Sequence, residues 1–215
     1  MRLVDELHAE HVLIDSVAGS FRAWARAYVD GTADSLEARR YLRFFRVWAN
    51  DFHHAREEAL FLEALVRVAS LPKERGPIAV ILADHARMAG WLAAIEPAIE
   101  RDGRADVLAL VTRYTRELGH HIDAENHVLF PEGVMRLKRH GAYELEGREP
   151  TLEEREAEAE GEALVRRFAP IDDPEAFRGE GCMLCPAYGT SCDGLEREWW
   201  TESEWEEIHD RLTGM

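Results

Sequence analysis

Apolar residues recur at three- and four-residue steps along four stretches of the chain, which is the period of helices that bury one face. The stretches cover residues 3–29, 35–69, 77–101 and 104–130. Turn signals separate them, at Asp30-Gly31, Leu71-Pro72 and Asp102-Gly103. Long amphipathic helices joined by short turns predict an all-α fold, an antiparallel up-down four-helix bundle.

The pattern changes beyond about Leu137, where a polar connector containing glycine begins. A capping box at Thr151–Glu154 predicts a strongly acidic helix to about Phe168, and a second at Thr201–Glu204 predicts a short final helix. The apolar content here is too thin for a core of its own. We therefore expect two parts, a bundle of residues 1–138 and a helical and irregular C-terminal extension of residues 139–215 packed on it.

Composition narrows the classes of partner. The 215 residues carry a formal charge of −16, from 42 acidic against 26 basic residues. Without a run of Lys or Arg, such a surface repels nucleic acid and anionic membranes. The N-terminus lacks the apolar core of a signal peptide, and no stretch approaches the roughly 20 apolar residues that span a bilayer. We expect a soluble, cytoplasmic protein with no nucleic-acid or membrane partner.

Two distant stretches repeat one local pattern, a His followed four residues later by a Glu. They are FHHAREEALF, with His54 and Glu58, and HHIDAENHVLFP, with His121 and Glu125. Residues four apart stack on one face of an α-helix, so each pair can direct two ligand atoms to one place.

Each stretch contains adjacent histidines, and a helical wheel distinguishes between them. Measured at 100° per residue from His54, Glu58 and the apolar Phe61 fall within about 40°, whereas His53 and Glu57 lie roughly 100° and 60° away. On the fourth helix the same arithmetic places His121 with the apolar side and His120 off it. The wheel therefore predicts that His54, Glu58 and His121 face the interior.

Histidines on the first and third helices face the same interior. The predicted inner set is His11, His54, Glu58, His85, His121 and Glu125. A carboxylate in a bundle core is costly unless it is paired or bound to a cation. Four His and two Glu suit a pair of first-row transition metals, and mixed imidazole and carboxylate ligation fits iron, with manganese or zinc as substitutes.

The first 135 or so residues resemble the hemerythrin-like (HHE cation-binding) family. The resemblance is carried by Glu10-His11, HHAREE at His53–Glu58, Asp84-His85, and HHIDAEN followed by VLFP on the fourth helix. It implies a four-helix bundle with two iron ions that bind oxygen or a related small ligand such as nitric oxide. It also implies the six inner residues as ligands, with Glu58 and Glu125 as the bridging carboxylates.

One position departs from that family's pattern. Oxygen-carrying hemerythrins usually offer two His one turn apart on the third helix, and the position one turn after His85 holds Ala89. One iron would then lack an imidazole, which favours a more open and reactive site. Glu10 faces inward and is a candidate extra ligand. His8, His53, His120 and His127 are expected to be solvated or to lie behind the ligands.

The three cysteines form a second candidate site. Cys182, Cys185 and Cys192 lie in CMLCPAYGTSC, outside the resemblance. A CxxC pair brings two thiolates to one ion, zinc or iron–sulfur, with Cys192 as a third ligand. The alternatives are reduced thiols or one disulfide formed on oxidation.

Three functions remain open at this level. The first is a non-haem di-iron binding protein that handles oxygen, nitric oxide or iron in sensing, carriage or storage. The second is a di-iron enzyme such as a peroxidase, an oxidase or an iron-centre repair protein. The third is a structural or interaction module in which metal staples the bundle. The tryptophans Trp199, Trp200 and Trp205 are candidates for anchoring the tail or for a homo-oligomer contact.

Overall fold

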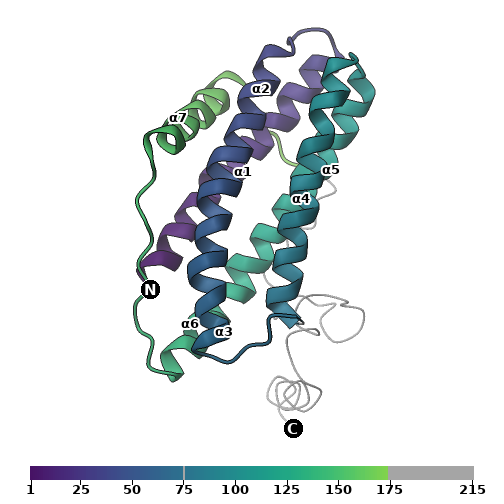
Figure 1. The fold of residues 1–215 in the computed structure, drawn as a ribbon. Coiled ribbons are helices and arrows are strands. Elements are labelled where there is room, and N and C mark those ends of the chain that lie inside the picture. Colours follow the sequence, from purple (N-terminus) through teal and green to yellow (C-terminus); the bar gives the residue numbers. More distant parts are fainter. Residues whose placement is uncertain (75, 174–215) are drawn as a thin grey trace.

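A computed structural model describes residues 1–74 and 76–173, and the regular structure of this part of the chain is entirely helical. Four rods stand side by side (Figure 1). The first rod is α1 (Arg2–Val29), and the second is the run of α2 (Leu36–Arg43), η1 (Phe44–His54), η2 (Glu57–Leu62) and α3 (Glu63–Arg67). The third is α4 (Gly76–Glu100), and the fourth is α5 (Arg104–Ala124), η3 (Glu125–Leu129) and α6 (Phe130–Arg139). The predicted all-α helical bundle is confirmed.

The second and fourth rods are not regular α-helices throughout. Their segments η1, η2 and η3 are π-helical, with hydrogen bonds from residue i to i+5. π winding is rare, and where it occurs it often marks a functional site. Here it coincides with the two stretches that contain the His and Glu pairs.

The core consists of two apolar clusters, one toward each end of the bundle. One contains the buried aromatics Phe21, Tyr41 and Phe45, and the rings of Phe21 and Tyr41 stack with centroids 4.6 Å apart. The other contains Leu7 and Phe61. Along α1, His11 falls between Leu7 of one cluster and Ile14 of the other, and the histidines of the second and third rods are placed in the same way. On the fourth rod, Glu125 falls between Ile122 and Val128. A polar layer therefore crosses the bundle between two apolar layers.

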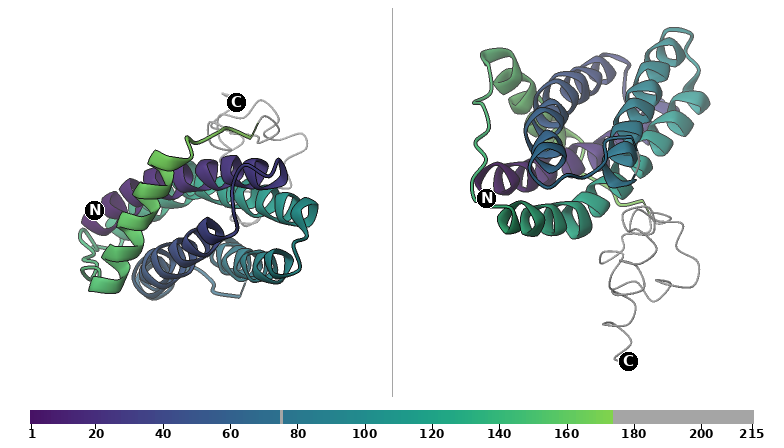
Figure 2. Two further views of the ribbon diagram at one scale, coloured as in Figure 1. Left: turned by 90° about the horizontal axis from the view of Figure 1, so that it is seen from above. Right: turned by 60° about the horizontal axis from the view of Figure 1, so that its bottom comes forward.

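The C-terminal extension begins with a connector that runs past the N-terminus and leads to α7 (Leu152–Arg167). Seen from above in the left view of Figure 2, α7 lies across α1, and it packs against α1 and the second rod. The predicted capping box forms: Thr151 accepts from the amide of Glu154 at 3.3 Å, and the Thr151 amide donates to Glu154 Oε2 at 2.6 Å. The division into parts 1–138 and 139–215 stays a prediction.

The third rod differs from one expectation. By length and composition alone, α4 is apolar enough to cross a membrane, with a mean hydropathy of 1.4 over its most apolar window. Core helices of bundles often share this property, and α4 packs closely against α5 and turns His85 into the polar layer.

Candidate metal centre

Four imidazoles, one from each rod, meet in the polar layer. They are those of His11 on α1, His53 on η1, His85 on α4 and His121 on α5, all buried. The four rings form two pairs. The Nε2 atoms of His11 and His53 lie 3.0 Å apart, and those of His85 and His121 also lie 3.0 Å apart.

Glu125 lies between the two pairs and is completely buried. Its Oε2 is 3.1 Å from His11 Nε2, and its Oε1 is 2.9 Å from His121 Nε2. Glu57, also completely buried, places Oε2 3.5 Å from His85 Nε2. One carboxylate thus has an oxygen directed to each histidine pair, with a second carboxylate beside it.

An oxygen acceptor lies behind each of the four imidazoles, on the side of its Nδ1 atom. The Nδ1-to-oxygen distances are 2.7 Å for His11–Asn126, 2.8 Å for His53–Glu10, 2.6 Å for His85–Glu58 and 3.7 Å for His121–Asp84. The first three distances are those of hydrogen bonds, whereas Asp84 is too far from His121 Nδ1 for a direct one. The three hydrogen bonds favour a proton on Nδ1, and in a neutral imidazole that leaves the Nε2 lone pair directed inward. Histidine ligands of metals usually show this arrangement.

His54 adds a fifth imidazole. Its ring stacks on His85 with centroids 3.9 Å apart and meets His121 edge-on at 5.5 Å. Ligand nitrogens of these three histidines lie within 4.8 Å of one another. The His85–His121 pair therefore has a third imidazole that comes from the second rod.

Burial and charge perturb both acidic and basic groups of the layer. Burial, reinforced by Glu125, raises the pKa of Glu57 well above its ordinary value. Burial also opposes ionisation of Glu125, but the charge on His121 and the nearby imidazole nitrogens of His11 and His85 outweigh it and hold the pKa of Glu125 well below the usual range. Glu125 therefore carries a negative charge that the layer must balance.

The pKa values of four buried histidines shift in opposite directions. Burial would lower the pKa of His85 and of His121, but Glu125 and the acceptors behind the rings raise both to about 9. Burial lowers the pKa of His53 to about 4 and, with the charge of His85, holds the pKa of His54 well below its ordinary value. Because metal ligation requires neutral imidazoles, a cation that binds at the His85–His121 pair would displace protons from it.

The donor set fits a metal ion. Within residues 1–74 and 76–173, neither oxygen of Glu57 and neither oxygen of Glu125 has a directed hydrogen bond. Buried carboxylates without donors are costly, and a cation would satisfy them. Three groups have ligand atoms close enough to share an ion: His54, His85 and His121; Glu57, His85, His121 and Glu125; and His11, His53 and Glu125.

The structure differs from the helical wheel at two pairs of adjacent residues, Glu57 with Glu58 and His53 with His54. Glu58, predicted inside, has a side chain that is 40 % exposed and lies behind His85, whereas Glu57 is completely buried. His53, expected outside, is completely buried beside the buried His54. The physical reason is the π winding of η1 and η2, which turns the chain by less than the 100° per residue that the wheel assumes.

The other predicted residues are placed as follows. His11, His85, His121 and Glu125 come together in the interior, and His120 is exposed. The ligand roles of His11, His85, His121 and Glu125 stay predictions. Glu10 reaches His53 Nδ1 and not the Nε2 side where the ligand atoms gather. Asn126 and Asp84 were not predicted as contacts of the histidines, although each is next in sequence to a predicted ligand. Cys182, Cys185 and Cys192 lie outside the described residues.

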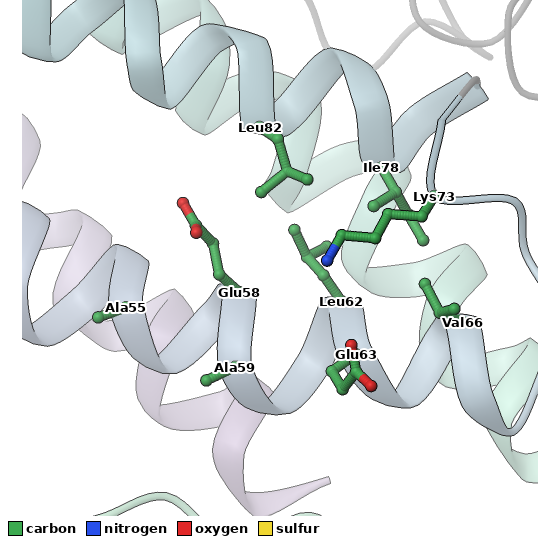
Figure 3. A pocket seen from close by; sticks show the side chains of 9 residues that line it. All are labelled: Ala55, Glu58, Ala59, Leu62, Glu63, Val66, Lys73, Ile78 and Leu82. Carbon is green, nitrogen blue, oxygen red and sulfur yellow. The ribbon is translucent and has the colours of Figure 1, made fainter.

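A groove of ≈ 460 Å³ opens beside the centre, between the second rod and α4. Figure 3 shows Glu58 at one end and Lys73 toward the other, with Leu62 and Leu82 on its walls. Glu58 lines this groove and lies 2.6 Å from His85 Nδ1, so the groove borders the carboxylate behind His85.

The fold and the site define a cation-binding helical bundle. The chain matches the family described as the hemerythrin HHE cation binding domain over residues 2–132, more than half of its length, and it belongs to that family. No curated protein and no solved structure matches the chain. The match covers the four rods as far as the start of α6 and leaves out the connector and α7.

Proposed function

We propose that this protein is a non-haem di-iron protein that handles oxygen, nitric oxide or iron in sensing, carriage or storage. The observation that carries the proposal is the position of Glu125, which is fully buried and has one oxygen near His11 and the other near His121. A carboxylate in that position suits two cations better than one.

The proposed ligands fall into two half-sites with one carboxylate in common. His11 and His53 would hold one ion, and His85, His121 and His54 would hold the other. Glu125, with an oxygen near each histidine pair, would serve both ions, and Glu57, beside His85, would take the place of the predicted Glu58. Imidazole with carboxylate suits iron among the available metals, and an iron pair supplies reversible electron transfer and a coordination position for a small ligand.

The fifth imidazole changes the expectation drawn from Ala89. That residue is exposed on α4, so the third rod supplies only His85. His54 on the neighbouring rod lies beside His85 and His121 and supplies the imidazole in its place. This arrangement supports reversible binding of a small ligand.

Metal content and spectra test the proposal. Purified protein should contain close to two iron atoms per chain and show absorption that changes with oxygen, nitric oxide or reductant. His121→Ala should lose iron, whereas His120→Ala, which changes the exposed neighbour, should retain it. Protein that takes up no iron after reconstitution would contradict the proposal, and bound iron without any ligand-dependent change would favour a structural role.

The groove favours a second candidate, a di-iron enzyme. Its volume of ≈ 460 Å³ exceeds the space that a diatomic ligand requires, and it is lined by Glu58, which contacts His85. Turnover of peroxide or nitric oxide well above that of free iron would support this candidate. A stable and unreactive oxygen adduct would count against it.

A further inference from the structure

Arg56 is a buried cation close to the proposed centre. Only 3 % of its side chain is exposed, and its guanidinium lies 4.3 Å from the centroid of the Phe52 ring. It donates to Glu10 Oε1 at 2.6 Å and to Glu6 Oε2 at 2.7 Å. A buried arginine requires such partners, and both carboxylates come from α1. Arg56 thus joins the second rod to the first.

Glu10 connects Arg56 to the histidines. Its Oε2 accepts from His53 Nδ1 at 2.8 Å, while its Oε1 accepts from Arg56. The far nitrogen of His53, Nε2, is the atom that lies 3.0 Å from His11 Nε2. A continuous set of hydrogen bonds therefore runs from Arg56 through Glu10 to one half of the site.

The connector closes over Arg56 from outside. We call residues 145–150 the connector clamp. The backbone of Gly147 approaches the guanidinium so closely that an added Cβ would lie 2.7 Å from one Arg56 terminal nitrogen and 2.9 Å from Nε. Leu145 accepts from the backbone amide of Leu3 at 3.1 Å, which fixes this end of the clamp to α1.

The other end of the connector clamp is fixed by Arg148. Its guanidinium lies 4.9 Å from the centroid of the Phe52 ring, the same ring that Arg56 covers. It also donates to Glu154 Oε2 at 2.7 Å and to the backbone oxygen of Asp51 at 3.3 Å. The connector clamp is thus attached both to the second rod and to the capping box of α7.

We propose that Glu10 and Arg56 are positioning residues for the His11–His53 half-site, held in place by the connector clamp. The proposal rests on the proposed function, since it assigns roles around the same centre. A carboxylate behind a histidine fixes the ring and strengthens its free nitrogen as a donor, and loss of such a partner typically costs 10- to 100-fold in metal affinity. The acceptors behind the other pair lie on other elements, Glu58 on η2 and Asp84 on α4. Substitution of Glu10 should therefore lower metal affinity at the His11–His53 half-site and leave the affinity of the other half-site nearly unchanged.

Zn²⁺ titration of the metal-free full chain, in competition with a coloured chelator, tests this inference. The unaltered protein should bind two ions. Glu10→Ala should raise the dissociation constant of one ion by about 10- to 100-fold and leave the other within about threefold. Glu10→Gln retains an oxygen acceptor and should restore part of the loss. Arg46, on the same rod as Arg56, forms a half-exposed ion pair with Glu96 of α4, and Arg46→Gln should bind like the unaltered protein.

A glycine substitution tests the connector clamp without touching the centre. Gly147→Ala adds a methyl group too close to the guanidinium of Arg56, so Arg56 or the connector must shift, and the variant should weaken the same ion as Glu10→Ala. Gly90→Ala is the matched control, because no atom lies within 4 Å of the added methyl group. The visible spectrum of the Co²⁺-loaded protein should change for Gly147→Ala and not for Gly90→Ala.

The possible results separate the inference from the proposed function. An unaltered protein that binds no Zn²⁺ contradicts both. An unaltered protein with two ions and a Glu10→Ala variant with two unchanged affinities overturns only the positioning role. Equal weakening of both ions, in parallel with a lower melting temperature, shows a merely structural role and also overturns it.

Discussion

The buried carboxyl group of Glu57 indicates that the interior of the bundle is suited to bind a cation. Its side chain is completely buried, and its pKa is raised well above the ordinary value by burial and by Glu125. No hydrogen-bond donor among the described residues reaches its oxygens. Such a residue destabilises a metal-free protein, so its presence is explained by binding and not by folding.

We predict opposite effects of Glu57→Gln on stability and on metal binding. The amide has nearly the same shape without the buried acid, so metal-free protein should gain about 1 to 2 kcal/mol in the free energy of unfolding. Metal affinity should fall by tenfold or more. Urea unfolding with a chelator and Zn²⁺ titration measure the two quantities. Glu58→Gln retains an oxygen acceptor for His85 and should lose less affinity. A larger loss for Glu58→Gln would show that Glu58, and not Glu57, is the ligand.

At the scale of the element, the winding of the second rod decides which residues enter the site. A wheel of 100° per residue correctly places His121 inside and His120 outside, because α5 is a regular α-helix as far as Ala124. The same wheel fails for Glu57 and His53, because η1 and η2 are π-helical. Apolar periodicity predicted the bundle, but periodicity cannot reveal a change of winding. That change depends on the packing of rods that are distant in sequence.

The π winding predicts that both adjacent histidines matter. His53→Ala and His54→Ala should each weaken binding of one ion by at least tenfold, because each removes an imidazole from a different half-site. The double variant should lose affinity for both ions. Zn²⁺ titration distinguishes the outcomes. Loss of affinity for His54→Ala alone would support the helical-wheel prediction that only His54 is a ligand, and it would contradict a ligand role for His53.

The capping box of α7 predicts a dependence on pH. The hydrogen bond from Arg148, aided by the Thr151 amide against the opposing effect of burial, lowers the pKa of Glu154 to about 2. A carboxyl group with a lowered pKa in the folded state stabilises the fold fully above its ordinary value near 4.5, and this stabilisation is lost as the pH falls toward 2. Because the pair is near the surface, we expect a contribution of about 1 kcal/mol.

Hydrogen exchange in α7 between pH 2 and pH 5 measures this contribution. Protection of α7 should fall across that range in the unaltered protein. Glu154→Gln should be less protected at pH 5 and should match the unaltered protein near pH 2. Glu153→Gln changes the exposed neighbouring carboxylate and should behave like the unaltered protein. Equal protection of Glu154→Gln at every pH would show that the Arg148 ion pair does not stabilise α7.

Across the whole molecule, one polar layer is enclosed by two apolar clusters, and each of the four rods contributes to it. The apolar clusters hold the rods together without metal, whereas the layer between them brings together acids and imidazoles. The bundle should therefore fold when metal-free and gain stability when cations bind. The connector clamp adds a further tie, since it links α7 to Arg56 and through Glu10 to His53.

Removal of metal should lower the stability of the whole bundle. A ligand present at 100 times its dissociation constant stabilises the folded state by about 2.7 kcal/mol per site, so two ions should add roughly 5 kcal/mol. Thermal unfolding of the full chain with Zn²⁺ and with excess chelator measures the difference as a change in melting temperature. His121→Ala with His11→Ala removes an imidazole from each half-site and should abolish most of that change. His120→Ala should preserve it, because that side chain is exposed. Identical melting temperatures with and without metal would mean that no cation joins the four rods at this layer.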